Sequence, residues 1–316
     1  MPLPSAVNSN ASKPAVAGDA AAGRLMRIAS YASVAVASLL IVAKLLVWFV
    51  TDSVAILSSL MDSVLDVGAS AINMYAIAHA LMPADREHRF GHGKAEALAG
   101  LAQAAFIGGS ALFLVAEAGQ RLVEPRPISR DEIGIAVMVF SLALTGGLVL
   151  FQLYVVRRTG SVAISADSMH YRADILANLG VILALVLAGR YGWLYADPLI
   201  ALAVAAYIVQ GAWQVGRVAL DQLMDRELPE ADRARIRDIA LSHPMVEDVH
   251  DLRTRSSGSQ SFIQLHLELD GDLSLHRAHD IADSVELRIG QAFPAAEVII
   301  HQDPAGIEEN HGQLLG

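Results

Sequence analysis

Long apolar runs, each near the length of a bilayer crossing, dominate the first two thirds of the sequence. A hydrocarbon core of about 30 Å requires roughly 20 helical residues at 1.5 Å each. Only 18% of the residues are charged, against about 25% in soluble proteins. The first, third, fourth and sixth runs also lack the amphipathicity of helices in a large soluble protein. The sequence predicts an α-helical membrane protein with six spans, at 28–50, 53–81, 95–118, 132–156, 161–189 and 196–220.

The distribution of basic residues predicts the orientation of these spans. An even number of crossings places both chain ends on one side, together with the loops at 83–94 and 157–160. The positive-inside bias assigns the more basic side to the cytoplasm. One side carries nine basic residues: Arg24, Arg27, Arg86, Arg89, Lys94, Arg157, Arg158, Arg217 and Arg226. The other side carries four: Arg121, Arg126, Arg130 and Arg190. We therefore expect a multi-pass protein with both termini in the cytoplasm.

Changes in composition divide the chain into four parts. Residues 1–23 lack an apolar segment and are expected to form a disordered tail rather than a signal peptide. Residues 24–222 form the predicted transmembrane domain. Residues 223–304 form a small α+β domain, because their pattern follows the order αββαβ. Residues 305–316 are expected to be a flexible tail. The helices of the small domain are predicted at 229–242 and 274–293, and its strands at 246–255, 262–270 and 297–303.

Several classes of protein are disfavoured by what the sequence lacks. It contains no cysteine, which excludes disulfides and thiolate metal ligands. A net charge of −10 gives no support for nucleic-acid binding. No Walker motif is present, so the sequence shows no nucleotide-binding loop that could drive pumping by ATP hydrolysis.

The second and fifth spans contain related segments. "SVAILSSLMDSVLDVGAS" from Ser53 aligns without a gap on "SVAISADSMHYRADILAN" from Ser161. The alignment pairs Met61 with Met169, Asp62 with His170, Asp66 with Asp174, and Ala69 with Ala177. Because the two copies are three spans apart, they cross the membrane in opposite directions. Such inverted repeats are typical of secondary transporters, with a binding site at the repeat interface.

The polar residues of the two copies form a candidate intramembrane metal site. A spacing of four residues places Asp62 and Asp66 on one helical face, and His170 and Asp174 on another. Three carboxylates and one imidazole suit tetrahedral Zn²⁺, and the absence of sulfur leaves Fe²⁺, Mn²⁺, Cd²⁺ or Co²⁺ open. The alternative is hydrogen bonding between helices by buried polar groups. Asp167 and Arg172 have no counterpart at a ligand position, and spacing identifies no partner for Lys44.

A second candidate site lies in the loop "PADREHRFGHGK". Asp85, His88 and His92 are spaced so that a turn closed by glycines brings them round one ion. The alternative is an ordinary solvated loop. A zinc protease of the H-E-x-x-H type is excluded here, because Arg89 occupies the position of the catalytic glutamate.

A third candidate site lies in the small domain. His301 and Asp303 are two residues apart on a predicted strand and therefore share a face, and His266 shares a polar face with Gln264 and Glu268. The remaining candidates are His250 and His279, while His243, His276 and His311 are interpreted as surface residues. The alternative is a solvated sheet face.

Four motifs together resemble the cation diffusion facilitator family, most closely its bacterial YiiP/FieF branch. They are D-S-V-L-D in span two, H-Y-R-A-D in span five, "PADREHRFGHGKAE" between spans two and three, and "HDLRTRxSG…FIQLHLEL…VIIHQDP" in the small domain. The resemblance covers about residues 24–304.

The resemblance implies a homodimeric divalent-cation/proton antiporter in the inner membrane that exports metal from the cytoplasm. It implies a transport site of Asp62, Asp66, His170 and Asp174, and a loop site of Asp85, His88 and His92. It also implies a binuclear site of His250, His266, His279, His301 and Asp303 in a metallochaperone-like domain, and a Lys94–Asp225 salt bridge at the hinge. An aspartate at position 62 is associated with zinc, cadmium and iron, so Zn²⁺ is expected, with Fe²⁺, Cd²⁺ or Mn²⁺ as further candidates.

The expected mechanism is alternating access, in which metal displaces protons from His170 and the carboxylates. One alternative is a membrane-anchored metal-sensing dimer without transport. The paired intramembrane ligands argue against it, because a membrane anchor does not need them. The other alternative is an intramembrane metallohydrolase, which requires an open metal site beside a general base. Four ligands would close that site, so an enzyme is not expected.

Overall fold

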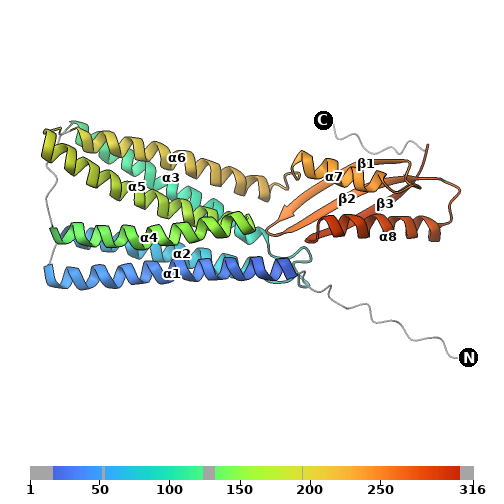
Figure 1. Ribbon diagram of the computed structural model, residues 1–316, viewed down its shortest axis with the longest axis horizontal. Coiled ribbons are helices and arrows are strands. Elements are labelled where there is room, and N and C mark those ends of the chain that lie inside the picture. Colours follow the sequence, from blue (N-terminus) through green and yellow to red (C-terminus); the bar gives the residue numbers. More distant parts are fainter. Residues whose placement is uncertain (1–16, 52–53, 124–131, 194, 307–316) are drawn as a thin grey trace, which may run out of the picture.

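Six long helices and a small α+β domain make up the part of the chain that the structure describes. This structure is a computed structural model, and it describes residues 17–51, 54–123, 132–193 and 195–306. The long helices lie side by side in an elongated bundle, with the C-terminal domain at one end (Figure 1). They are α1 (Ala17–Thr51), α2 (Val54–Ala80), α3 (Lys94–Val123), α4 (Glu132–Thr159), α5 (Val162–Tyr191) and α6 (Ala196–Leu223).

Four of these helices, α1, α3, α4 and α6, are long and apolar enough to cross a membrane. The other two, α2 and α5, carry the repeated polar motifs and are 27 and 30 residues long. They run in opposite directions within the bundle, with α2 directed toward the C-terminal domain and α5 away from it (Figure 1). This is the antiparallel arrangement that the inverted repeat predicts.

The N-terminal boundary differs from the prediction. Helix α1 begins at Ala17, whereas we expected a disordered tail to residue 23 and a span from residue 28. Residues 17–23 contain mostly alanine and glycine, and the alanines have the highest helix propensity of any residue, so the helix extends beyond the apolar run. The other parts of the two predicted tails, 1–16 and 307–316, lie outside the described residues.

Helix α5 is held closely by its neighbours through small residues. A side chain at Gly211 of α6 would overlap Met169, since an added Cβ atom would lie 2.0 Å from its Cε. Met169 is buried with alanines of α3 and α6, including Ala104 and Ala212. Close approach of this kind is typical of membrane helices, where packing rather than the hydrophobic effect drives association.

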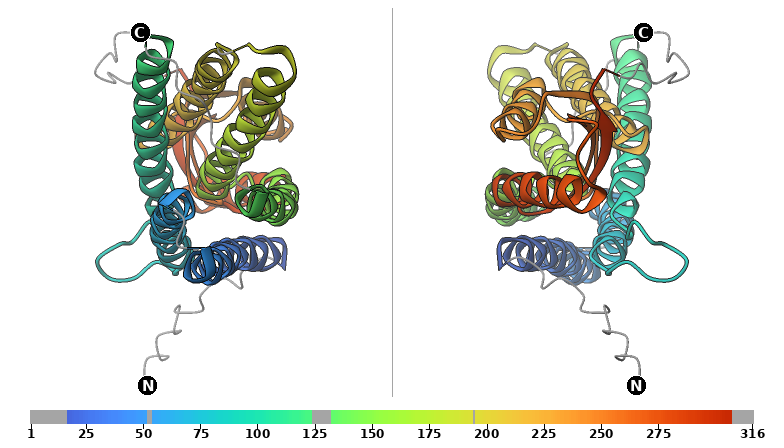
Figure 2. Two further views of the ribbon diagram at one scale, coloured as in Figure 1. Left: turned by 90° about the vertical axis from the view of Figure 1, so that its left-hand side faces the viewer. Right: turned by 90° about the vertical axis from the view of Figure 1, so that its right-hand side faces the viewer.

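The C-terminal domain has the predicted αββαβ order. Its elements are α7 (Glu230–Leu241), β1 (Asp248–Ser257), β2 (Gln260–Leu269), α8 (Leu275–Ala292) and β3 (Ala296–Pro304). Strand β2 is central, paired antiparallel with β1 and parallel with β3. Alternate residues of β2, such as Ile263 and Leu265, join the apolar core with residues of α7 and α8. The end-on views show that the domain lies along the axis of the bundle (Figure 2).

Candidate metal centres

Helices α2 and α5 meet at a cluster of ionisable side chains in the bundle. His170 Nε2 lies 2.9 Å from Asp66 Oδ1 and 3.7 Å from Asp174 Oδ2. One donor atom from each of these three residues lies within 4.8 Å of the others. His170 is 7% exposed, whereas the side chains of Asp66 and Asp174 are partly exposed. We call these three residues the membrane centre.

Asp62 does not join the membrane centre in this structure. It lies one turn before Asp66 on α2, a displacement of about 6 Å along the helix axis, and it is exposed. The sequence predicts convergence of all four residues, because spacing fixes the face of a helix. Spacing does not fix the axial position at which two helices contact each other, so it could not predict that Asp62 lies outside the cluster.

The structure gives Lys44 its partners. Its Nζ donates to the Ser59 carbonyl oxygen at 3.0 Å and to Ser63 Oγ at 2.7 Å. Both acceptors are on α2, one three residues before Asp62 and the other directly after it. A buried ammonium group therefore ties α1 to α2 close to the membrane centre.

Asp167, which has no counterpart at a ligand position in the repeat, lies at the centre of a buried polar network. Its side chain is fully buried, one turn from His170. Oδ2 accepts hydrogen bonds from Ser33 at 2.5 Å and Gln152 at 2.6 Å. Oδ1 accepts from Gln103 at 3.3 Å and Ser70 at 3.4 Å. The four donors come from α1, α4, α3 and α2. One carboxylate on α5 therefore links α5 to every long helix of the bundle except α6. No signal in the sequence singles out these donors, because each is one of several polar residues in its span.

The loop between α2 and α3 gathers Asp85, His88 and His92, which we call the loop centre. One donor atom from each lies within 4.8 Å of the others. Asp85 Oδ2 is 3.3 Å from His92 Nε2, and Asp85 Oδ1 is 3.5 Å from His88 Nδ1. Gly91 allows the turn, with a φ of +77°. The backbone N–H of His88 donates to Asp85 Oδ1 at 2.6 Å, and this hydrogen bond lowers the pKa of the Asp85 carboxyl. The site therefore offers an ionised oxygen ligand.

The loop centre is joined to the C-terminal domain. Lys94 Nζ lies 2.9 Å from Asp225 Oδ1, which confirms the salt bridge implied by the resemblance. Arg255 lies 3.6 Å from the other oxygen of Asp225, and its guanidinium stacks on Phe90 at 4.7 Å and on Phe262 at 4.9 Å. Phe90, which lies between His88 and His92 in the loop, thus contacts the β1–β2 hairpin directly.

His250, His266 and Asp303, here called the cytoplasmic centre, form a third cluster. Cross-strand register places His250 opposite His266, and His266 beside His301. Asp303 Oδ2 is 2.7 Å from His266 Nδ1 and 3.3 Å from His250 Nε2. His301 Nε2 reaches the other oxygen of Asp303 at 3.0 Å. Asp303 is thereby in contact with three imidazoles.

His279 is not brought to the cytoplasmic centre within one chain. It lies on α8, where its Nδ1 is 3.7 Å from Asp283 Oδ1. Helix α8 packs on the core face of the sheet, because its buried residues belong to the apolar cluster. The three-residue cluster lies on the strands instead. Membership of His279 in this centre stays a prediction.

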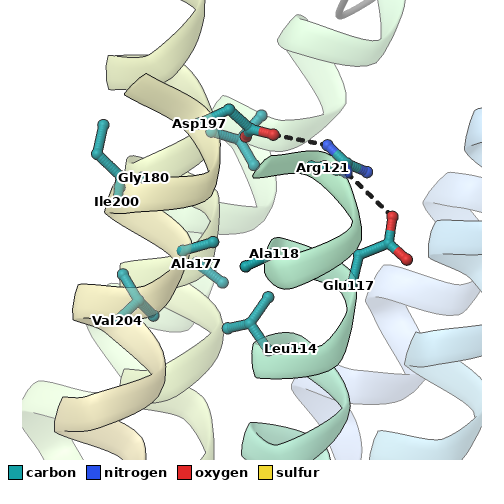
Figure 3. Close-up of a pocket in the computed structure, with 11 residues that line it drawn as sticks. Leu114, Glu117, Ala118, Arg121, Ala177, Gly180, Asp197, Ile200 and Val204 are labelled. Carbon is teal, nitrogen blue, oxygen red and sulfur yellow. Dashed lines mark hydrogen bonds and ion pairs between the residues drawn. The ribbon is translucent and has the colours of Figure 1, made fainter. Parts of the chain in front are cut away.

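The far end of the bundle contains a cavity of about 140 Å³ between α3, α5 and α6 (Figure 3). Its lining is mainly apolar, with small residues such as Ala177 and Gly180. At one side, Arg121 donates to Asp197 Oδ2 at 2.7 Å and to Glu117 Oε1 at 3.0 Å. Arg121 therefore bridges α3 and α6 at the end opposite the C-terminal domain.

A helical membrane domain with a carboxylate–imidazole cluster, joined to a small domain with its own cluster, is an arrangement that could hold metal cations in both domains. Comparison with known families agrees. Residues 30–224 match the cation efflux transmembrane domain, and residues 228–305 match the cation efflux protein cytoplasmic domain. The chain belongs to the cation efflux family, a family of transporters rather than enzymes.

Its relatives include two proteins named cation-efflux pump FieF. The one from Shewanella oneidensis is 50% identical over 283 residues, 90% of this chain and 95% of the relative. The one from Salmonella choleraesuis is 48% identical over 291 residues, 92% of this chain and 97% of the relative. The chain therefore corresponds to these pumps over nearly their whole length.

Smaller solved structures are similar to part of the chain. One, described as the zinc form of the putative zinc transporter CzrB, is 36% identical and covers 27% of this chain and 98% of its own, with a TM-score of 0.26. Another, the metal-bound C-terminal domain of the CzcD transporter from Thermotoga maritima, is 26% identical. It covers 26% of this chain and 100% of its own, with a TM-score of 0.25.

Proposed function

We propose that the protein is a divalent metal cation/proton antiporter that exports Zn²⁺ from the cytoplasm by alternating access. Fe²⁺, Cd²⁺ and Mn²⁺ are further candidate cargoes, because oxygen and nitrogen ligands without sulfur accept all of them. The observation that carries the proposal is the membrane centre, where α2 and α5 bring two carboxylates to one imidazole at 2.9 and 3.7 Å. Ionisable groups inside a membrane are costly, and they mark transport pathways.

Proton exchange follows from the chemistry of the ligands. A metal binds carboxylates and neutral imidazoles, so its arrival displaces protons and its departure allows their return. Histidine is the side chain whose charge changes most readily between pH 5 and 8, which makes His170 the proposed proton carrier. Asp62 is proposed to complete the set of ligands when α2 shifts relative to α5.

The proposed setting is the inner membrane, with both termini in the cytoplasm and two copies forming a homodimer. This orientation places the loop and cytoplasmic centres on the side from which metal enters. We propose that His301 and His279 extend the cytoplasmic centre to a binuclear site in the dimer. The sequence has no cysteine, so single introduced cysteines can report which side each loop faces. Light scattering of the purified protein measures the number of copies.

Vesicles containing the purified protein test the transport activity. We expect external Zn²⁺ to enter the vesicles under a proton gradient, with a matching change in internal pH. His170→Ala is expected to abolish both signals, whereas the exposed control His276→Ala is expected to keep them. Zn²⁺ binding without uptake would contradict transport and favour the membrane-anchored sensor. Competition by Fe²⁺, Cd²⁺ and Mn²⁺ in the same vesicles identifies the preferred cargo.

A further inference from the structure

A fourth imidazole, from outside the loop, lies beside the loop centre. His79 is in the last turn of α2, before the loop begins. Its ring meets the His92 ring edge-on, with the two centroids 4.6 Å apart. The His92 ring is in turn 4.6 Å from the ring of His88. Three imidazoles thus form a row that runs from the end of α2 into the loop.

These three histidines share one cavity. It has a volume of about 400 Å³ and is lined by His79, His88 and His92, with Lys94 and Asp225 at the domain junction. A water molecule occupies about 30 Å³ of liquid, so the cavity has room for an ion and for side chains to rearrange around it.

His92 provides an independent sign that this cavity accepts a ligand. Its side chain is only 5% exposed, and its Nδ1 has no hydrogen-bond partner among the described residues. Buried polar atoms are nearly always paired, because an unpaired one costs about 1–3 kcal/mol. A metal ion bound at Nδ1 would pair this atom, and the other ring nitrogen, Nε2, already lies 3.3 Å from Asp85 Oδ2.

The loop centre is one ligand short of a closed tetrahedral set. Asp85, His88 and His92 supply three donors, whereas structural zinc sites have four protein ligands. We propose that His79 is the fourth ligand of the loop centre, giving three imidazoles and one carboxylate around Zn²⁺ or a similar divalent ion. This inference rests on the proposed binding of metal at the loop centre. The donor atoms of His79 lie outside the 4.8 Å cluster, so its ring turns toward the ion on binding.

Such a centre fastens α2 to the loop. Asp66 of the membrane centre is 13 residues before His79 on the same helix, about 20 Å along its axis. The loop in turn contacts the β1–β2 hairpin through Phe90, whose ring lies against Arg255 and Phe262, and through Gly93, which packs on Ser257. Metal at the loop centre therefore fixes the cytoplasmic end of the helix that carries a transport ligand, and it links cytoplasmic metal to the position of α2.

A cysteine at position 79 gives the sharpest test, because the natural chain has no other. We expect the full-length His79→Cys variant, kept reduced and loaded with Co²⁺, to show a near-ultraviolet thiolate-to-cobalt absorption band. The control His276→Cys, exposed on α8, is expected to show none. Addition of His88→Ala to His79→Cys is expected to remove the band, since the ion then loses its site.

A second variant guards against a cysteine side chain that is too short to reach the ion. We expect His79→Gln to weaken Co²⁺ binding at the loop centre by at least about tenfold, the lower end of what loss of a supporting group costs a metal site. Either response, if abolished by His88→Ala, supports the proposal. The inference is overturned if His79→Cys gives no band and His79→Gln binds as the natural chain does.

The same series separates this inference from the proposal on which it depends. Suppose that His88→Ala and His92→Ala each bind fewer ions than the natural chain, while His79→Cys gives no band and His79→Gln binds normally. The loop centre is then supported, and only the assignment of His79 as its fourth ligand is wrong. If the number of bound ions is unchanged in His88→Ala and His92→Ala as well, the loop centre itself is contradicted.

Discussion

His170 Nε2 lies 2.9 Å from Asp66 Oδ1, although 104 residues separate them in the sequence. The contact joins two helices that run in opposite directions and contain the two copies of one motif. It places a basic and an acidic side chain together inside the membrane domain. The effects of substitutions at this contact and around it can be stated in advance.

Asp62 and Asp66 are expected to differ in the size of their effects. Asp66→Asn removes the negative charge next to His170 and replaces one carboxylate oxygen by an amide nitrogen, so we expect it to abolish Zn²⁺ binding at the membrane centre. Asp62→Asn changes a residue outside the cluster and is expected to weaken binding by a smaller factor. Calorimetric titration in detergent measures both, with the exposed Asp238→Asn as the control. Equal losses in the two variants would indicate that Asp62 already belongs to the site.

Asp303 is expected to be essential to the cytoplasmic centre. Its carboxylate is 3% exposed and contacts three imidazoles. In an Asp66→Ala/His88→Ala background, which disables the membrane and loop centres, we expect saturating Zn²⁺ to stabilise the fold, by about 2.7 kcal/mol at a hundred times the dissociation constant. Asp303→Asn is expected to remove most of this gain, and the exposed control Asp270→Asn to keep it. Thermal unfolding with and without Zn²⁺ provides the measurement, and full stabilisation of Asp303→Asn would exclude its role as a ligand.

Asp167 is expected to stabilise the membrane domain. Asp167→Ala removes an acceptor shared by Ser33, Gln152 and Gln103. Ser33 keeps the Ala29 carbonyl oxygen and Gln152 keeps Ser33 Oγ, so Gln103 is the donor left without another acceptor among the described residues. A buried group left unpaired costs about 1–3 kcal/mol, and we expect a loss of that size in the free energy of unfolding, measured in detergent. Asp238→Ala, on an exposed face of α7, is the control. A loss no larger than that of the control would show that the network contributes little.

Gly93 is expected to be required for the junction between the two domains. A Cβ atom there would lie 2.3 Å from the Ser257 carbonyl oxygen, a backbone atom that cannot turn away. Gly93→Ala is therefore expected to separate the loop from the β1–β2 hairpin and to speed hydrogen exchange in both. Gly109→Ala on α3, where a Cβ atom meets nothing within 4 Å, is the matched control. Unchanged hydrogen exchange in Gly93→Ala would show that the hairpin accommodates the added methyl group without loss of stability.

Arg121 is expected to fasten α3 to α6 at the end opposite the C-terminal domain. Because its side chain is partly exposed, solvent and salt screen its two ion pairs, and Arg121→Gln is expected to cost only about 1 kcal/mol. This loss should shrink as the salt concentration rises. Unfolding of Arg121→Gln and of the exposed control Arg190→Gln at low and high salt distinguishes an ion pair from a loss of packing, which salt does not change.

Asp66, His170 and Asp174 could be predicted from the sequence because the repeat carries them at equivalent positions, and helical spacing fixes which face they share. The same reasoning predicted the loop centre, since all three of its ligands lie within eight residues. It could not predict Asp167, whose four donors come from four helices. Spacing within a helix does not say how that helix is rotated against its neighbours.

The sequence by itself determined the long apolar helices, the inverted repeat, the αββαβ domain and the ligand types, because these depend on local periodicity and composition. Only the tertiary structure decided which ligands meet. It left Asp62 one turn from the membrane centre and His279 on the far side of the sheet, and it brought His79 to the loop. Those outcomes depend on the height and rotation at which packed helices and strands come together, and that packing joins residues far apart in the chain.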